Sequence, residues 1–363
     1  MSRQQIEDTL DRLRAKLSVS GSQTSASARG QTVRANLAPT LDLVAEIMRQ
    51  PSFPPAELET LKRERDRGAR RRPNRSALDR RSRARPLRQS VPAGDGRYTP
   101  TLDEAIKQIQ TPGVDALKSF HQRFYGGAAA EIAVVGDFDA PTVKAQLERL
   151  FGDWKSPSAF TRVPDPLVAK RANAMPIETP DKANAYLTGS TSFALNDRDP
   201  DYPAFLLANY MLGGSTNSRL WNRVRQKEGL SYGINSSFRA SSFEPNSSFN
   251  IGAIFAPQNL QPLRTAVQEE LKRALTDGFS AAEIEESKRA MLQERRLART
   301  QDAGVADALT QQAYLGRTFA YSGEVDAAIA KLTPEAVNAA LRKYMQPDAF
   351  AFVFAGDFAK TRK

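Results

Sequence analysis

A guanidinium and a phenol hydroxyl stand seven residues apart in the segment LWNRVRQKEGLSYGINSSF, residues 220–238. Arg225 lies in a stretch with helical character, Tyr232 in a stretch typical of a strand, and Gly229 separates them. Arginine donates several hydrogen bonds and tyrosine can donate one, so the pair offers donors to another molecule. Each also has an ordinary structural explanation: Arg225 could pair with an acidic neighbour on an exposed helix, and Tyr232 could be a half-buried strand aromatic.

Gly229 is the residue expected to position this pair. Glycine adopts a left-handed conformation readily, so a helix ending near Glu228 could reverse at Gly229. The last helical turn and the second strand residue could then project side by side. Four residues before this helix are expected to shape and cap it rather than to contact a ligand: Gly213, Gly214, Ser215 and Asn217.

Several classes of catalytic site are excluded by composition. The chain has one histidine, His121, and no cysteine, so it cannot hold His-Glu-x-x-His, its inversion, or a thiolate site. A Gly-x-Ser-x-Gly elbow, a P-loop and a Gly-x-Gly-x-x-Gly fingerprint are also missing from the sequence. His121 lies among apolar residues and is expected to be a partly buried structural histidine. Glu283 and Glu286 are expected to be solvated carboxylates on an exposed helix face. No catalytic residue and no metal ligand is therefore expected on this chain alone.

The length and charge of the chain limit the number of domains and the kinds of partner that we expect. At 363 residues and 40% hydrophobic content, the chain is long enough for about two domains. No apolar stretch approaches the ~18–20 residues of a membrane span. Of the net charge of +11, residues 63–88 contribute +9, from twelve arginines and three acidic residues.

This arginine-rich segment, residues 63–88, has three interpretations. It could be a solvated basic loop, a patch for nucleic acid or an acidic partner, or a stretch translated out of frame. For the last, codons can be chosen for residues 86–92 whose shifted reading gives His-Phe-Ala-Asn-Pro-Tyr-Pro. Nucleic-acid binding is disfavoured, because no aromatic residue is interleaved with the arginines.

An internal repeat organises the chain. Residues 111–138 and 333–358 share a Thr-Pro start, an apolar helix, a turn and a buried strand ending Gly-Asp-Phe, which predicts two copies of one unit. We expect threonine at the cap and proline at the first helical position in both copies. Strands and helices fall in blocks, so the predicted class is α+β, with two homologous domains that each pack helices on a largely antiparallel sheet.

The predicted boundaries follow from the repeat. Residues 1–155 form the first domain, 156–182 a linker rich in Pro, Ser and Lys, and 183–363 the second domain with Arg225 and Tyr232. The strand NAYLTGSTSFAL and the helix YPAFLLANYML of the second domain have no counterpart in the first. We therefore expect the first domain to be incomplete at its N-terminus by about forty residues; a natural short form is the alternative.

The segment MLGGSTNSRLWNRVRQKEGLSYGINSSF, residues 211–238, resembles the pitrilysin/insulinase family of zinc metallopeptidases. The stretches LVAEIMRQPSFPPAELETLKRE, FHQRFYGGAAAEIAVVGDFD and LFGDW extend the resemblance over nearly the whole chain except the arginine-rich segment. Its motifs match the half of such enzymes that carries an arginine and a tyrosine opposite the zinc site.

The resemblance implies a non-catalytic, substrate-binding half or subunit of such a peptidase, one half of a clamshell. Its partner would carry the zinc motif and the zinc, and peptide would be the substrate. Tyr232 would donate a hydrogen bond to the oxyanion, and Arg225 would hold a substrate carbonyl. A structural core protein of the same fold is the alternative. For a bacterial protein the resemblance favours the periplasm or envelope; the sequence itself leaves the compartment open.

Overall fold

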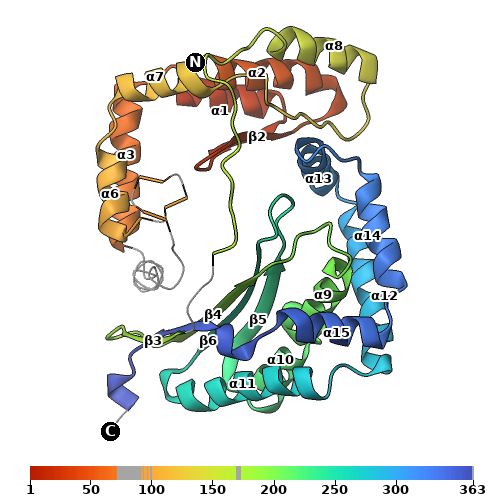
Figure 1. Ribbon diagram of the computed structural model, residues 1–363. Helices are drawn as coiled ribbons and strands as arrows, with labels where there is room; N and C mark the ends of the chain where they lie inside the picture. The colour runs from red at the N-terminus through yellow and green to blue at the C-terminus, as the bar shows by residue number, and fades with distance from the viewer. Residues whose placement is uncertain (72–90, 93, 96, 99, 169–172, 362–363) are drawn as a thin grey trace. The chain divides into compact units, whose positions relative to one another are not determined.

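The structure is a computed structural model that describes residues 1–71, 91–92, 94–95, 97–98, 100–168 and 173–361 (Figure 1). These residues form two compact units. The first contains the described parts of Met1–Arg72, Pro92–Val163 and Gln301–Gly316, and the second includes Pro164–Thr300 and Arg317–Lys363. The predicted α+β class is confirmed, because helices and largely antiparallel sheets are combined. That the two are homologous domains stays a prediction.

The first unit is mostly helical. Its strands β1 (Lys16–Gly21) and β2 (Ala26–Gln31) form an antiparallel hairpin. Its helices are η1 (Arg34–Asn36), α1 (Arg3–Arg12), α2 (Leu37–Arg49), α3 (Pro55–Arg71), α6 (Leu102–Gln110), α7 (Val114–Phe124), α8 (Ala140–Phe151) and α13 (Asp302–Tyr314). Helices α2 and α8 contact one another, and α2 also contacts β2.

Two predictions for the first unit are wrong. Thr111 does not cap the helix of the first repeat: it follows the last residue of α6, and Gly113 is the N-cap of α7. Residues 131–135, the counterpart of a strand in the second repeat, form no strand, because they share no ladder hydrogen bonds with either described sheet. Residues 63–71 continue α3. The remainder of the arginine-rich segment, residues 72–88, lies outside the described residues.

A five-stranded mixed sheet in the order β3-β7-β4-β6-β5 forms the second unit. Its strands are β3 (Asn173–Glu178), β4 (Ala185–Phe193), β5 (Ser231–Arg239), β6 (Ser247–Phe255) and β7 (Ala351–Gly356). Neighbouring strands pair antiparallel except β3 and β7, which are parallel. Strand β3 falls inside the segment expected to be a linker, and β5 is an edge strand.

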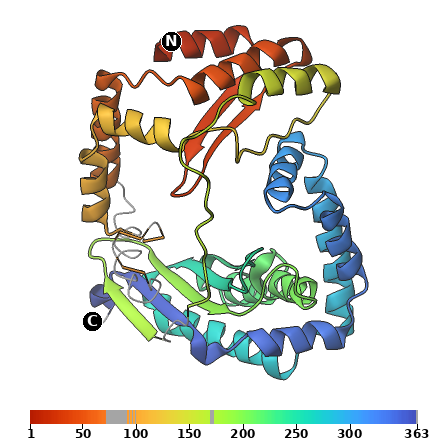
Figure 2. The same ribbon diagram turned by 45° about the horizontal axis from the view of Figure 1, so that its top comes forward.

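Helices cover one face of this sheet (Figures 1 and 2). They are α9 (Tyr202–Asn209), the π-helix η2 (Tyr210–Gly214), α10 (Arg219–Trp221), the π-helix η3 (Asn222–Lys227), α11 (Leu260–Thr276) and α15 (Pro334–Tyr344). Helices α12 (Ala281–Ala298) and α14 (Ala320–Ala330) pack against one another and against α9. Short 3-10 turns lie at η4 (Pro257–Asn259), η5 (Pro347–Ala349) and η6 (Ala359–Thr361). Thr333 and Pro334 take the predicted cap and first helical positions of α15.

Alternating strand residues and one stripe of each helix make the core of the second unit. Leu187 of β4 and Ile251 of β6 are buried against Leu263 and Leu271 of α11 in one apolar cluster. Burying such a side chain contributes about 1.5–3 kcal/mol. One stripe of α11 is buried in this core, and Gly278, with φ +72°, follows the C-terminus of the helix.

Candidate functional site

The segment from α10 to β5 is anchored by two buried residues. Leu220 and Val224, four residues apart, are both fully buried in the core, which fixes the orientation of α10 and η3. Gly229 follows with φ +60°, the left-handed conformation that the reversal requires. The reversal closes when Leu230 N–H donates to Val224 O at 2.9 Å.

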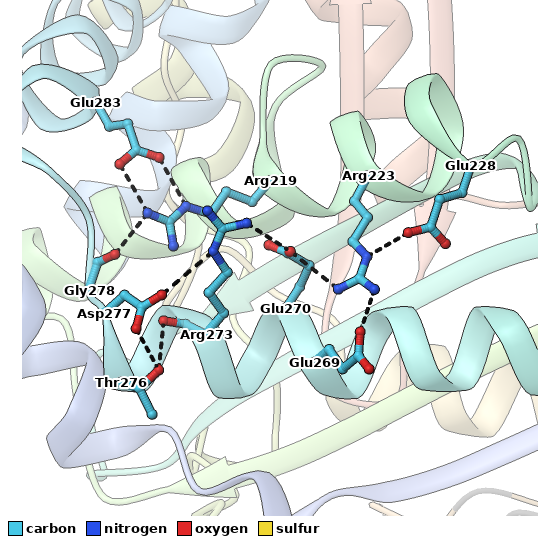
Figure 3. Close-up of polar contacts among 10 residues, drawn as sticks. All are labelled: Arg219, Arg223, Glu228, Glu269, Glu270, Arg273, Thr276, Asp277, Gly278 and Glu283. Atoms are coloured by element: carbon cyan, nitrogen blue, oxygen red, sulfur yellow. Dashed lines mark hydrogen bonds and ion pairs between the residues drawn. The ribbon is translucent and has the colours of Figure 1, made fainter.

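Arg219 is held by helix α12 (Figure 3). Its guanidinium forms a two-point ion pair with Glu283, with Nε–Oε1 at 2.9 Å and Nη2–Oε2 at 3.0 Å. Nη2 also donates to Gly278 O at 2.8 Å, and Cζ lies 4.4 Å from the ring centroid of Phe279. Arg219 therefore fastens α10 to the start of α12, and Glu283 is a paired carboxylate rather than the solvated one that the sequence suggested.

Arg223 is held by helix α11 and by its own helix end (Figure 3). It pairs with Glu228 at 2.8 Å, with Glu269, and with Glu270 at 3.4 Å. The Glu270 side chain is only 4% exposed, so Arg223 compensates a buried negative charge. Hydrogen bonds to Glu269 and Glu228 raise the pKa of Arg223 above its ordinary value.

Arg225, two residues further, has a different environment. Two residues correspond to about half a helical turn, so Arg225 leaves η3 on the side away from Arg223. Its side chain is exposed, and it forms no hydrogen bond or ion pair with any residue that the structure describes. The interpretation that Arg225 pairs with an acidic neighbour thus describes Arg223 instead.

Tyr232 lies in a bulge at the start of edge strand β5. Ser231 pairs with Phe255 and Gly233 with the next residue of β6, Ile254, so Tyr232 is the inserted residue. The Ser231 hydroxyl braces the bulge: it lies 2.8 Å from Gly233 O and 2.7 Å from Ile254 O. The Tyr232 side chain is 66% exposed. Within the described residues it makes no hydrogen bond or ring contact, so the half-buried interpretation is wrong.

Both candidate residues therefore sit on backbone irregularities next to one reversal. π-Helical turns and β-bulges are found frequently at functional sites, where they redirect a side chain. Helix η3 contacts β5, so the two elements adjoin. No described hydrogen bond or ring contact joins Arg225 to Tyr232, which leaves both groups available to a third molecule.

The glycine turn before α10 has a packing role. A Cβ atom at Gly213 would lie 2.7 Å from Ser236 Oγ and 2.8 Å from Ser236 N, so only glycine lets η2 approach β5 this closely. Ser218 takes the N-cap position of α10, and Asn217 O accepts a hydrogen bond from Asn222 at 2.9 Å. The prediction that this turn shapes the helix is confirmed, but the predicted cap at Ser215 or Asn217 is wrong, because the helix begins only after Ser218.

The residues described here do not fit a zinc ion. No group of three or more His, Asp or Glu side chains within the described ranges could ligate a metal. His121 is partly buried, as expected, with Nε2 2.8 Å from Met48 O and its ring beside Tyr125. No described helix is both long enough and apolar enough to cross a membrane.

The sequence did not reveal the anchoring role of Arg219 and Arg223. A signal was present: the two arginines are four residues apart, like Leu220 and Val224, so one helical face carries the charges beside the buried face. Their partners come from α11 and α12, between 46 and 64 residues away, and helical spacing alone does not identify such partners.

Comparison with known proteins identifies the family that part of this chain matches. Residues 113–291 match the family described as the peptidase M16 inactive domain. The uncharacterized zinc protease YmxG of Bacillus subtilis is 28% identical over 177 residues. The matched region is 49% of this chain and 42% of that relative, so the chain spans about two fifths of the relative's length.

Solved structures share the fold. The peptidase M16 inactive domain from Pseudomonas fluorescens has a TM-score of 0.82 and 22% identity over 97% of this chain and 83% of that one. A protease from Helicobacter pylori has a TM-score of 0.77 and 16% identity over 96% and 84%. The periplasmic protease PqqL from Escherichia coli has a TM-score of 0.71 and 16% identity over 98% of this chain but 39% of its own.

At these identities the structural likeness concerns the fold alone, whereas the family match covers the segment with Arg225 and Tyr232. The resemblance to pitrilysin/insulinase-type zinc metallopeptidases is thereby confirmed, and residues 113–291 belong to the peptidase M16 family as its inactive domain.

Proposed function

We propose that this chain is a non-catalytic, substrate-binding half or subunit of an M16 peptidase. Its partner, a half or subunit with the zinc motif, would hold the zinc and its ligands. Arg225 and Tyr232 would be supplied to that site and would contact the peptide substrate. The chain on its own would not cleave peptides.

The observation that carries this proposal is the contrast among three arginines of one helical stretch. Arg219 and Arg223 are each bound by carboxylates, whereas Arg225 is exposed and has no partner in the described part of the chain. Tyr232 is likewise exposed, and its bulge is braced by Ser231. Groups placed this firmly, yet left without intramolecular partners, suit recognition of another molecule.

The chemistry would be hydrogen-bond donation. The Tyr232 hydroxyl would donate to the oxygen of the amide under attack as negative charge develops on it, and the Arg225 guanidinium would donate to a neighbouring peptide carbonyl. Removing one such preorganised donor typically lowers kcat by about 10²–10³-fold. Their rigid attachment to η3 and β5 limits the entropy lost on binding.

Reconstitution with a zinc-motif partner tests the proposal. In the assembled peptidase, Tyr232→Phe is expected to lower kcat, and Arg225→Ala to raise KM about tenfold. Arg289→Ala, which removes an exposed arginine of α12, is the matched control and should leave both constants unchanged. If the assembly cleaves equally well with both site changes, the assigned roles are wrong and the alternative of a structural core protein is favoured.

A further inference from the structure

Leu230 connects the Gly229 reversal to strand β5, and both of its backbone polar groups are held. Its N–H donates to Val224 O at 2.9 Å, within the reversal itself. Its carbonyl oxygen accepts a hydrogen bond from the side chain of Asn259, with Nδ2 and O 3.1 Å apart. Asn259 lies 29 positions further along the chain, so this second bond ties the reversal to another part of the second unit.

Asn259 reaches Leu230 because of the way β6 leads into α11. Ser231 pairs with Phe255, the last residue of β6, so the start of β5 lies beside the turn that follows β6. This turn is η4, which ends at Asn259. Asn259 is also the N-cap residue of α11, but its side chain makes no hydrogen bond to that helix. Pro262, the third residue of α11, has no N–H to offer, so the carboxamide is used on the reversal instead.

Helix α11 therefore holds the reversal from two sides. Before the reversal, Glu270 of α11 pairs with Arg223 at 3.4 Å. After it, Asn259 at the N-cap of α11 bonds to Leu230. Each member of the candidate pair lies two residues from one of these attachments. The direction in which each side chain leaves the backbone thus depends on contacts made by its neighbours.

Ser231 holds the backbone on the other side of Tyr232. Its hydroxyl accepts a hydrogen bond from Gly233 N–H at 3.1 Å, in addition to its contacts with Gly233 O and Ile254 O. Ser231 is only 5% exposed, and the carboxamide N–H of Asn259 is already bonded to Leu230. These two side chains are therefore placed to act on the backbone that carries Tyr232 rather than on a ligand.

We infer that Asn259 and Ser231 are positioning residues for Tyr232. Together they fix the backbone before and after the bulged residue, which sets the direction of the phenol. This inference rests on the proposed function, in which the Tyr232 hydroxyl donates to the substrate, and it names the residues that keep this donor in place. Because the donor acts on charge that develops in the transition state, its misalignment should lower kcat and leave KM nearly unchanged.

Two variants separate positioning from folding. Asn259→Asp keeps the size of the side chain but replaces the donor to Leu230 O by an acceptor. The new negative charge lies at the N-terminus of α11, where the helix dipole favours it, so the melting temperature should not fall. Ser231→Ala removes the hydroxyl from the bulge. Ser247→Ala is the matched control, because Ser247 is also buried and donates to Leu195 O at 2.8 Å, at the opposite end of β6 from the bulge.

Amide hydrogen exchange of the full chain tests the inference without substrate or partner. In peptides that span residues 229–235, Asn259→Asp and Ser231→Ala should each raise the exchange rate about tenfold, as expected for lost hydrogen bonds that hold this backbone. Ser247→Ala should leave the exchange of these peptides unchanged. Exchange at the wild-type rate in both site variants would overturn the inference.

Kinetics of the peptidase assembled with its zinc-motif partner give the second measurement. Asn259→Asp and Ser231→Ala should each lower kcat about tenfold, with KM within about twofold of wild type, because a small misplacement of a reacting group is costly. Ser247→Ala should match wild type in both constants. A raised KM with normal kcat in the two site variants would also overturn the inference.

The same kinetics distinguish failure of this inference from failure of the proposed function. If Tyr232→Phe lowers kcat but Asn259→Asp and Ser231→Ala do not, the positioning role is overturned and the proposed function stands. If Tyr232→Phe leaves kcat unchanged, the proposed function fails, while faster exchange in the two site variants still supports their hold on the backbone around Tyr232.

Discussion

At the scale of single residues, hydrogen-bond partners separate structural arginines from the candidate functional one. Arg219 and Arg223 connect their helical segment to α12 and α11 through Glu283 and Glu270. Arg225 belongs to the same π-helix η3 as Arg223 but takes no part in this network. Chemically identical side chains thus have different roles because of where each points.

Replacing Arg223 by alanine should therefore lower the stability of the fold much more than replacing Arg225. Arg223→Ala leaves Glu270 buried with only Arg273, at 3.7 Å, and should lower the free energy of unfolding. We expect a loss of about 2–3 kcal/mol, below the usual cost of uncoupling a buried pair because Arg273 remains. Arg225→Ala should change it by less than about 0.5 kcal/mol. Urea denaturation measures both, and equal losses would contradict the assignment.

Glu283 gives the fold a measurable dependence on acid. Partial burial raises the pKa of its carboxyl, but hydrogen bonds from Arg219 and Ser280 outweigh burial and lower the pKa to about 2 from an ordinary 4.5. A depressed folded-state pKa stabilises the fold above pH 4.5, and this stabilisation is lost as the pH falls toward 2. Since the side chain is 41% exposed, solvent screening limits the effect to about 1 kcal/mol.

Glu283→Gln should accordingly remove about 1 kcal/mol of stability at pH 7 and flatten the stability profile between pH 4.5 and 2. Glu286→Gln, three residues along the same helix, is the matched control, because Glu286 is exposed and unpaired among the described residues. Unfolding free energies at several pH values test this, and identical profiles for the two variants would rule out the role given to Glu283.

At the scale of elements, the candidate site depends on departures from regular structure. The π-helix η3 carries Arg225, the bulge of β5 carries Tyr232, and the π-helix η2 packs against β5 through Gly213. A regular helix and a regular strand of the same sequence would place both side chains at other angles. The contact at Gly213 is the one that a substitution can test without touching the candidate pair.

Gly213→Ala should destabilise the second unit by about 1–3 kcal/mol, because the added Cβ would overlap the Ser236 backbone at 2.8 Å. Gly323→Ala in α14 is the matched control. A Cβ there meets no atom within 4 Å, so alanine should stabilise that helix by about 0.5–1 kcal/mol. Thermal denaturation shows whether each substitution raises or lowers the melting temperature. A Gly213→Ala variant more stable than wild type would contradict the close approach of η2 to β5.

Much of the local structure, such as helix ends and chain reversals, could be predicted from the sequence, because signals a few residues apart determine it. The Gly229 reversal and the Thr333 cap of α15 are both confirmed. Each depends on residues a few positions apart. Propensity, periodicity and capping are properties of that range.

What could not be predicted depends on distant partners. The strand expected at residues 131–135 needs ladder hydrogen bonds to a neighbouring strand, and these residues belong to neither described sheet. The bulge at Tyr232 depends on how β5 registers against β6, and the π-helical turns depend on packing. Arg225 and Tyr232 themselves were found through resemblance and spacing, whereas their exposure and lack of partners required the structure.

At the scale of the whole molecule, the features of this chain agree with a component of a larger peptidase. Residues 113–291 match the peptidase M16 inactive domain. Arg225 of η3 and Tyr232 at the start of edge strand β5 are both exposed and suited to hydrogen bonding. In our account, a partner completes the site.

The most direct test of this account is the kcat of the assembled peptidase carrying Tyr232→Phe, with Tyr314→Phe as the control that removes a phenol hydroxyl elsewhere. We predict that Tyr232→Phe lowers kcat at least about 100-fold, with the melting temperature and zinc content of the assembly unchanged. A kcat within about twofold of wild type would contradict the claim that Tyr232 acts on the substrate.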